Sequence, residues 1–376
     1  MKKLFIIVNQ DFFFLSHRKD IALQAKKEGF DVTIVASDTG KAGIIRSLGL
    51  GFIDLPINKT GLNPLEEFKT FLFLYRLIGR EKPDIVHLVG MKVILWGGLA
   101  ARLRHTEGIV SAVSGLGVMF SPEYNKGLKK ILSKGVLTVM RFIHNSGNAY
   151  CIFHNTDDQE LFVRNGIVAI QHCVRTMGSG IDLKEFGYVE EPSQGKIRIL
   201  FTGRMVEDKG VLVLIEAAEQ LRNDYQDKAE FILCGGLETN PMAVTKERLE
   251  SLCDGKYIHW LGKRSDIKEQ LENSHIFAFP SYYKEGLPKS CIEAAAIGRP
   301  VVTCDSTGCR DTVLDGQTGY LVPIKDPFAV AAKLRVLLDD GPLRRQMGKA
   351  AREFAERSFS VDDVVAAHLR IYDSVS

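Results

Sequence analysis

The chain has 376 residues, of which 45% are hydrophobic and 25% charged, as in a globular enzyme long enough for two domains. Its net charge of only +3 argues against a nucleic-acid binder held by bulk charge. The number of cysteines is odd and no C-x-x-C pair occurs, which argues against a disulfide framework or structural zinc and favours a reducing cytosol.

The first apolar run, Leu4–Val8, is too short for the hydrophobic region of a signal peptide and predicts a buried strand. No run approaches the roughly 18 apolar residues of a membrane-spanning helix. Further apolar runs alternate with helical stretches, two of them expected near Ser16–Gly29 and Gly40–Leu48. This β-α alternation predicts a parallel sheet with both faces covered.

The alternation pauses at the polar stretch Phe186–Lys196 and then resumes, with a helix expected from Gly210 to Leu221. We therefore predict an α/β chain of two doubly wound, Rossmann-like domains, residues 1–190 and 191–360, facing each other across a cleft. A final helix, 361–376, is expected to pack back on the first domain. In open α/β sheets ligands bind at the carboxyl ends of strands, where every motif below is expected to lie.

The motif FTGRMVEDKGV follows the first strand of the second domain. Gly203 lets the backbone turn, and Gly210 opens a helix. Arg204 and Lys209 near a helix start would suit a diphosphate. The same residues taken alone equally fit a basic loop on a solvated face.

The next strand ends at Cys234–Gly236. Gly235 and Gly236 permit close approach of the backbone to a ligand, although an ordinary tight turn would use the same residues.

The stretch SYYKEGLPKSCIEAAAIGRPVV holds two glutamates, Glu285 and Glu293, around a predicted helix from Pro288 to Ile297. Pro288 suits position N1, and Gly298 suits the helix end. A carboxylate there could accept two sugar hydroxyls, or both glutamates could simply be solvated. The backbone amides expected to face a ligand are those of Gly286, Leu287 and Lys289.

Together these motifs resemble the GT-B glycosyltransferases of family 4, the retaining nucleotide-sugar enzymes. The matching text is GRMVEDKG, FILCGG, HWLGKRSDI, FPSYYKEGLPKSCIEAAAIGRPVV and DTVLDGQTGYLVP, which covers most of residues 198–325. The resemblance implies that Arg204 and Lys209 bind the donor diphosphate, that Glu285 lies by the donor sugar, and that Glu293 holds the ribose. The implied donor site also includes Gly203, Gly235, Gly236, Arg264, Gly286, Leu287 and Pro288.

The first half, with LSHRKDIALQAKKEGFDVTIV, GLNPLEEF and SGLGVMF among its matches, looks like one branch of this family. That branch acts on lipid-linked oligosaccharides, and it includes the N-acetylgalactosaminyltransferase that extends undecaprenyl-diphosphate bacillosamine. The resemblance implies a hexosyltransferase that moves a sugar, an N-acetylhexosamine, from a UDP-sugar to a polyprenyl-diphosphate-linked saccharide. A GT-B epimerase or hydrolase, or a non-catalytic donor-binding subunit, are the alternatives.

The first half departs from the family at one strand end. Many members carry His-x-His there, whereas this chain has His87 followed by Val89. We therefore expect His87 to be a core histidine. Lys92 is a candidate for the acceptor side, as are Gly115 and Gly117. His17, in the first β-α turn, is either a weak catalytic candidate or a plain helix-start residue.

No D-x-D sequence occurs. The resemblance therefore implies an enzyme without cofactor or metal, in which Arg204, Lys209 and helix dipoles stabilise the leaving diphosphate.

The stretch Asn125–His144 reads as a basic amphipathic helix. Such a helix could lie on an anionic membrane surface, or it could pack on its own domain. The lipid-linked acceptor favours the membrane, which would make the protein a cytoplasmic enzyme that is peripheral on the inner face of the plasma membrane. The lysines assigned to this membrane face are Lys126, Lys129, Lys130 and Lys134.

Overall fold

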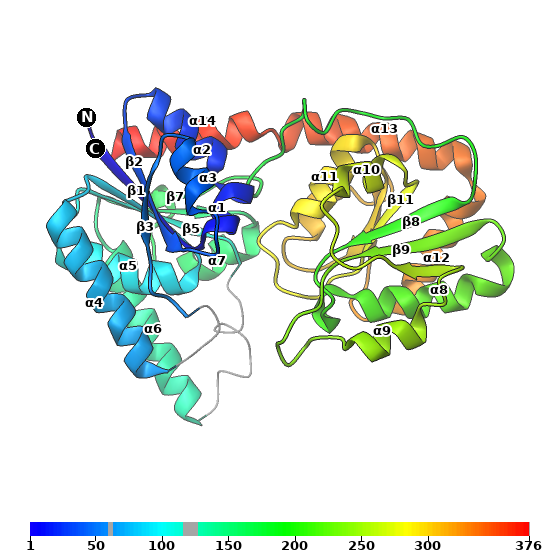
Figure 1. The fold of residues 1–376 in the computed structure, drawn as a ribbon, viewed down its shortest axis with the longest axis horizontal. Coiled ribbons are helices and arrows are strands. Elements are labelled where there is room, and N and C mark those ends of the chain that lie inside the picture. The colour runs from blue at the N-terminus through cyan, green and yellow to red at the C-terminus, as the bar shows by residue number, and fades with distance from the viewer. Residues whose placement is uncertain (59–62, 116–126, 376) are drawn as a thin grey trace. The chain divides into compact units, whose positions relative to one another are not determined.

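The structure is a computed structural model that describes residues 1–58, 63–115 and 127–375 (Figure 1). The chain forms two compact units, which we call unit 1 (Met1–Ser179 with Val361–Ser376) and unit 2 (Gly180–Ser360). In the described ranges no helix is both long and apolar enough to cross a bilayer.

Unit 1 is built on a parallel sheet with the strand order β3-β2-β1-β4-β5-β6-β7. Both faces of its central strands are buried, as expected for near-continuous apolar runs. The strands are β1 (Lys3–Gln10), β2 (Asp31–Ser37), β3 (Gly51–Asp54), β4 (Ile85–Val89), β5 (Gly108–Val113), β6 (Ala149–Phe153) and β7 (Cys173–Arg175).

The helices of unit 1 cover the two faces of this sheet (Figure 1). One face packs against α4 (Pro64–Glu81), α5 (Met91–Leu103), α6 (Gly127–His144) and α7 (Thr156–Arg164). The other packs against α1 (Asp11–His17), α2 (Lys19–Lys27), α3 (Ala42–Ser47) and the last helix, α14 (Val361–Ser374). A short 3-10 turn, η3 (Ile170–His172), precedes β7.

Unit 2 repeats the architecture with the strand order β10-β9-β8-β11-β12-β13, again parallel. Its strands are β8 (Ile197–Thr202), β9 (Ala229–Cys234), β10 (Ile258–Trp260), β11 (Ile276–Phe279), β12 (Val301–Cys304) and β13 (Gly319–Val322). Its helices are α8 (Val211–Tyr225), α9 (Lys246–Leu252), α10 (Ile267–Glu272), α11 (Lys289–Ile297), α12 (Pro327–Asp339) and α13 (Gly341–Ser358), with 3-10 turns η4 (Glu207–Lys209) and η5 (Arg310–Thr312).

The helix expected near Ser16–Gly29 is in fact two helices that meet at Arg18. Arg18 has φ −133° and ψ −2°, which is outside the helical range, so α1 ends before it and α2 begins after it. Its side chain is only 1% exposed. The break therefore accompanies the burial of a guanidinium, which the apolar periodicity does not reveal.

Two helices of unit 2, α12 and α13, were not assigned from the sequence although each carries a clear start signal. The side chain of Asp326 accepts a hydrogen bond from the amide of Ala329 at 2.9 Å, and that of Asp340 accepts from Leu343 at 2.8 Å. A proline follows in the first turn of each helix. Both are therefore aspartate-capped helices with proline at a favoured position.

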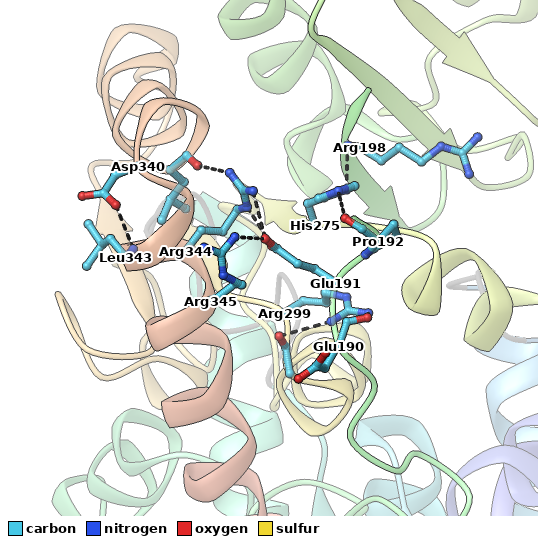
Figure 2. Close-up of polar contacts among 12 residues, drawn as sticks. Glu190, Glu191, Pro192, Arg198, His275, Arg299, Asp340, Leu343, Arg344 and Arg345 are labelled. Carbon is cyan, nitrogen blue, oxygen red and sulfur yellow. Dashed lines mark hydrogen bonds and ion pairs between the residues drawn. The ribbon is translucent and has the colours of Figure 1, made fainter. Parts of the chain in front are cut away.

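Unit 2 begins at Gly180, whereas the sequence predicts a domain boundary at 190/191. The polar stretch is held to unit 2 by buried arginines (Figure 2). Arg299 donates to the carbonyl of Val189 at 2.7 Å, and Arg344 forms a 2.8 Å ion pair with Glu191. Because these partners lie on α13 and beside β12, residues 189–191 pack as part of the second core despite their polar composition.

Candidate active site

The motifs singled out in the second half follow three neighbouring strands. The Arg204–Lys209 loop follows β8, Gly235 and Gly236 follow β9, and Glu285 follows β11. These strands are adjacent in the order β9-β8-β11 and run parallel, so their carboxyl ends share one edge of the sheet. That edge is where open α/β sheets bind ligands.

Two glycines allow the Arg204–Lys209 loop to fit between its neighbours. A side chain at Gly235 would place Cβ 1.7 Å from the carbonyl oxygen of Gly203. At Gly210, where φ is +80°, a Cβ would lie 2.0 Å from the carbonyl oxygen of Pro280. Glycine at 235 is thus required by contact with the protein backbone, which is a reason different from the ligand approach that the sequence suggested.

Lys209 and Glu285 form a direct ion pair. The Lys209 ammonium contacts Oε1 of Glu285, and the two side chains are only 13% and 10% exposed. The ammonium also lies 5.5 Å from the ring centroid of Phe279 and 5.1 Å from that of Tyr283, within cation-π range. The two residues that the sequence placed at the diphosphate and at the sugar therefore meet in one largely buried contact.

The backbone of Asp208 joins the two loops that carry this pair. Its carbonyl oxygen accepts hydrogen bonds from the amides of Tyr282 and Tyr283, both at 2.9 Å. Burial raises the pKa of the Asp208 carboxyl, and the nearby cations Lys209 and Arg204 partly oppose that rise. The main-chain hydrogen bonds of Asp208 therefore hold the Lys209 loop against the Glu285 loop, which brings the two charged side chains together.

Arg204 is held more loosely than Lys209. Its Nη1 lies 3.8 Å from Oε1 of Glu238, and the two side chains are 45% and 36% exposed. A long contact between exposed groups contributes little to stability, and it constrains the position of the Arg204 guanidinium only weakly. Arg264, by contrast, is paired with Asp266 through bonds of 2.7 and 2.5 Å on the exposed surface.

Helix α11 begins at Lys289, so the prediction of Pro288 at N1 is wrong by one position. Pro288 has φ −69° and ψ 114°, an extended conformation, and precedes the first helical residue. Gly298 ends the helix with φ 92°, as expected.

Glu293 lies in the second turn of α11 and is not a solvated surface residue. Its side chain is 15% exposed, and Nζ of Lys289 lies 3.9 Å away. Burial raises the pKa of Glu293 to about 7, with Lys289 opposing the rise and Glu185 adding to it. The carboxyl therefore changes charge near neutral pH.

The candidates in unit 1 lie in separate local arrangements. Nζ of Lys92 pairs with Glu67 at 2.6 Å and donates to the carbonyl of Asn58 at 2.8 Å. His17 stacks on Phe13 with centroids 4.3 Å apart. Gly115 follows β5 with φ 111°.

His87 is a core histidine, as the sequence predicts. It is fully buried, and its Nδ1 lies 2.6 Å from the hydroxyl of Tyr372 in α14. Burial lowers the pKa of His87 well below its usual value, and the neighbouring cation Arg18 is one of the groups that add to this effect.

Part of the predicted acceptor and membrane surface lies outside the described residues. This applies to Gly117 and Lys126, and to the side chains of Lys129 and Lys130. Lys134, on α6, is described and exposed. Among the residues that the structure describes, no three His, Cys, Asp or Glu side chains are grouped as metal ligands.

Ser281 and Asp208 take part in the site but were not singled out from the sequence. Ser281 is fully buried, and its Oγ lies 3.1 Å from Oε1 of Glu285. A signal was available, since Ser281 precedes Glu285 by four residues in the same strand-end loop. Small polar residues are too common in such loops for that signal to be specific.

Comparison with known proteins matches both halves of the chain. Residues 188–354 match the family described as "Glycosyl transferases group 1", and residues 3–146 match "Glycosyl transferase 4-like".

Several curated relatives match nearly the whole chain. The N,N'-diacetylbacillosaminyl-diphospho-undecaprenol alpha-1,3-N-acetylgalactosaminyltransferase of Campylobacter jejuni is 31% identical over 94% of this chain and 93% of its own length. The UDP-Gal:alpha-D-GlcNAc-diphosphoundecaprenol alpha-1,3-galactosyltransferase of Escherichia coli is 25% identical over 89% of this chain and 86% of its own.

Among solved structures, Anabaena HepE in complex with UDP and glucose matches with a TM-score of 0.77 and 16% identity. The match covers 100% of both chains, and it shows a shared fold.

Proposed function

The chain belongs to the group 1, family 4-like glycosyltransferases and has the GT-B fold, and from this premise we propose which sugar it transfers and to what. The donor is a UDP-N-acetylhexosamine, and the acceptor is a saccharide linked to a polyprenyl diphosphate. The observation that carries the proposal is the 31% identity, spread over 94% of the chain, to a transferase named for an undecaprenyl-diphosphate acceptor.

In this proposal the strand-end residues of unit 2 bind the donor. Lys209 and Arg204 neutralise the diphosphate, Glu285 lies by the sugar, and Glu293 accepts the ribose hydroxyls. The weak contact of Arg204 with Glu238 supports its role, because little must be broken before the guanidinium turns to phosphate oxygens. Gly203, Gly235, Gly236, Arg264, Gly286, Leu287 and Pro288 complete the proposed donor site.

The proposed reaction retains the anomeric configuration by attack on the face that the diphosphate leaves. The acceptor hydroxyl oxygen bonds to the anomeric carbon as the bond from that carbon to the β-phosphate oxygen breaks. The hydroxyl proton passes to the departing phosphate. Lys209 and Arg204 stabilise the charge that develops there, so we expect full activity in EDTA and no requirement for a metal or cofactor.

The acceptor is proposed to bind unit 1, near Lys92, Gly115 and Gly117, with His17 as a weaker candidate. We also propose that α6 rests on the inner face of the plasma membrane. Phe142 on this helix is 47% exposed and Lys134 is exposed, a mixture of apolar and basic groups that suits an anionic interface.

The donor proposal is tested by a thermal-shift screen of nucleotide-sugars followed by transfer assays on lipid-linked acceptors. A rise in Tm with UDP-N-acetylhexosamines, followed by transfer, is the expected result. Turnover of the UDP-sugar without any acceptor would instead indicate an epimerase or hydrolase. Binding without transfer to any acceptor would indicate a donor-binding subunit.

The membrane proposal is tested by charge reversal at Lys129, Lys130 and Lys134. We expect at least about a hundredfold weaker binding to vesicles that contain phosphatidylserine, since each basic residue near such a surface contributes about 1 kcal/mol and reversal adds repulsion to that loss. Reversal of Lys196, Lys228 and Lys246 in unit 2 is the matched control. Equal vesicle binding by both triple variants would remove the hypothesis.

A further inference from the structure

Ser281 occupies an unusual position in the proposed site. It lies two residues beyond β11, it is 0% exposed, and its hydroxyl oxygen is within hydrogen-bond distance of two acceptors. One acceptor is the carbonyl oxygen of Asp208 at 3.2 Å, and the other is Oε1 of Glu285 at 3.1 Å. A serine hydroxyl has a single proton, so it can donate to only one of them at a time.

Counting donors decides which acceptor takes the proton. The Asp208 carbonyl already accepts from the amides of Tyr282 and Tyr283 at 2.9 Å, which fills its two lone pairs. Glu285 offers a carboxylate, and hydrogen bonds to charged acceptors are about twice as strong as neutral ones. The serine proton therefore goes to Glu285.

The amide of Tyr283, whose shorter bond goes to the Asp208 carbonyl, is shared with the serine oxygen, from which it lies 3.3 Å away. The carbonyl of Ser281 accepts from the hydroxyl of Ser306 at 2.9 Å. Hydrogen bonds thus hold both the hydroxyl oxygen and the backbone carbonyl of Ser281, in addition to its contact with Glu285. A hydroxyl held in this way can fix the carboxylate more firmly than a mobile surface group could.

From this geometry we infer that Ser281 is a positioning residue that holds the Glu285 carboxylate for the donor sugar. The inference rests on the proposed function. Lys209 and Ser281 contact the same oxygen of Glu285. When a diphosphate competes for the Lys209 ammonium, Ser281 remains as a neutral contact that helps to keep Glu285 in place.

The test compares Ser281→Ala with wild type in kcat, in affinity for UDP and in affinity for the UDP-sugar. We expect kcat to fall about tenfold, the effect of losing one hydrogen bond to a charged group. Affinity for UDP should change less than twofold because UDP lacks the transferred sugar, which is the group that Glu285 is proposed to position. Ser274→Ala is the matched control: it removes another buried serine hydroxyl of unit 2, one that donates to the carbonyl of Leu271 and not to Glu285, so its kcat should stay within about twofold.

A double-mutant cycle separates positioning from a merely structural role. If Ser281 acts through Glu285, Ser281→Ala has no further effect on kcat or on UDP-sugar affinity once Glu285 is alanine. An equal loss in both backgrounds would overturn the inference, as would a wild-type kcat in Ser281→Ala. If the alanine variant does not fold, Ser281→Cys replaces it in the cycle with Glu285→Ala. Cysteine is similar in size to serine, but its thiol is a weaker hydrogen-bond donor than the hydroxyl.

Failure of the proposed function would look different. Wild-type protein that binds a UDP-sugar but transfers it to no acceptor would contradict the function. The ratio of UDP-sugar to UDP affinity in Ser281→Ala would still decide the role of Ser281, with an unchanged ratio counting against it.

Discussion

The two units each bury a cluster of polar side chains, and the clusters differ in how their charge is compensated. In unit 2 the strand-end cluster, Lys209, Glu285, Ser281 and Asp208, pairs a cation with a carboxylate. In unit 1 the core cluster, Arg18, His87, His154, His368 and Tyr372, surrounds a 1% exposed guanidinium with neutral groups. Across the described residues Arg18 has no carboxylate partner.

The core cluster joins α14 to the sheet of unit 1. Nη2 of Arg18 lies 3.3 Å from Nε2 of His154, and the Tyr372 hydroxyl lies 2.6 Å from His87. Nδ1 of His368 donates to the carbonyl of Val364 at 2.7 Å. Burial of polar side chains therefore does not by itself indicate a ligand-binding site. The core cluster is covered by α14, whereas the strand-end cluster lies at the carboxyl ends of parallel strands.

The largest predicted difference between the clusters is in their response to acid. Burial lowers the pKa of His87 and His154 well below the usual value, that of His368 to about 3, and that of His144, on α6 of the same unit, to about 4. Because the unfolded chain binds these protons first, the stability of unit 1 is fully present above pH 6.5 and is lost as the pH falls below it. Four such groups give a slope of up to about 5 kcal/mol per pH unit.

Urea unfolding at pH 7, 6 and 5 measures this slope. The tryptophans Trp96 and Trp260 lie in different units, so single-tryptophan variants report unit 1 and unit 2 separately. His368→Leu should reduce the slope of unit 1 by about a quarter. A slope near zero for unit 1 would mean that its histidines are not held neutral by burial.

The second prediction concerns activity. Lys209→Ala should lower kcat/KM at least about a hundredfold, because it removes a charge that acts in a water-poor site. It should also destabilise unit 2, since Glu285 is left buried without its partner. The matched control is Lys228→Ala, at an exposed lysine of the same unit, and it should change kcat/KM less than twofold. Full activity in Lys209→Ala would show that the ion pair is only structural.

The smallest predicted effect concerns Glu293, whose pKa shift has the opposite sign. A carboxyl whose pKa is raised to about 7 contributes stability below pH 4.5 that is lost as the pH rises through 7. The ionised form is the better acceptor for ribose hydroxyls, so affinity for a UDP-sugar should rise about tenfold from pH 6 to pH 8. Calorimetric titration measures this rise, and Glu293→Gln should abolish the pH dependence. An unchanged pH dependence in Glu293→Gln would assign it to another group.

Much of this architecture could be predicted from the sequence because parallel strands and strand-end motifs are local patterns. The GT-B fold, the family and the core position of His87 are confirmed. The contact between Lys209 and Glu285 could not be derived from spacing, since it depends on how β8 and β11 pair. Nor could the break at Arg18, because helical periodicity does not show that a guanidinium turns into the core.

Residues 189–191 and Lys92 illustrate the same limit at a longer range. Residues 189–191 look like a linker by composition, yet Arg299 and Arg344 draw them into unit 2 from more than 100 residues away. Lys92 was recognised only as a strand-end lysine, and its partner Glu67 comes from another helix. Local patterns therefore locate the candidates, whereas long-range pairing decides what each one contacts.

The central claim is retaining transfer of an N-acetylhexosamine, and the most direct measurement is the product itself. Wild-type protein would be incubated with a UDP-α-N-acetylhexosamine and an undecaprenyl-diphosphate-linked saccharide, and the new linkage read by NMR. An α-linked product, formed by wild type and at least about a hundredfold more slowly by Lys209→Ala, is the predicted result. A β-linked product, or hydrolysis of the donor alone, would contradict it.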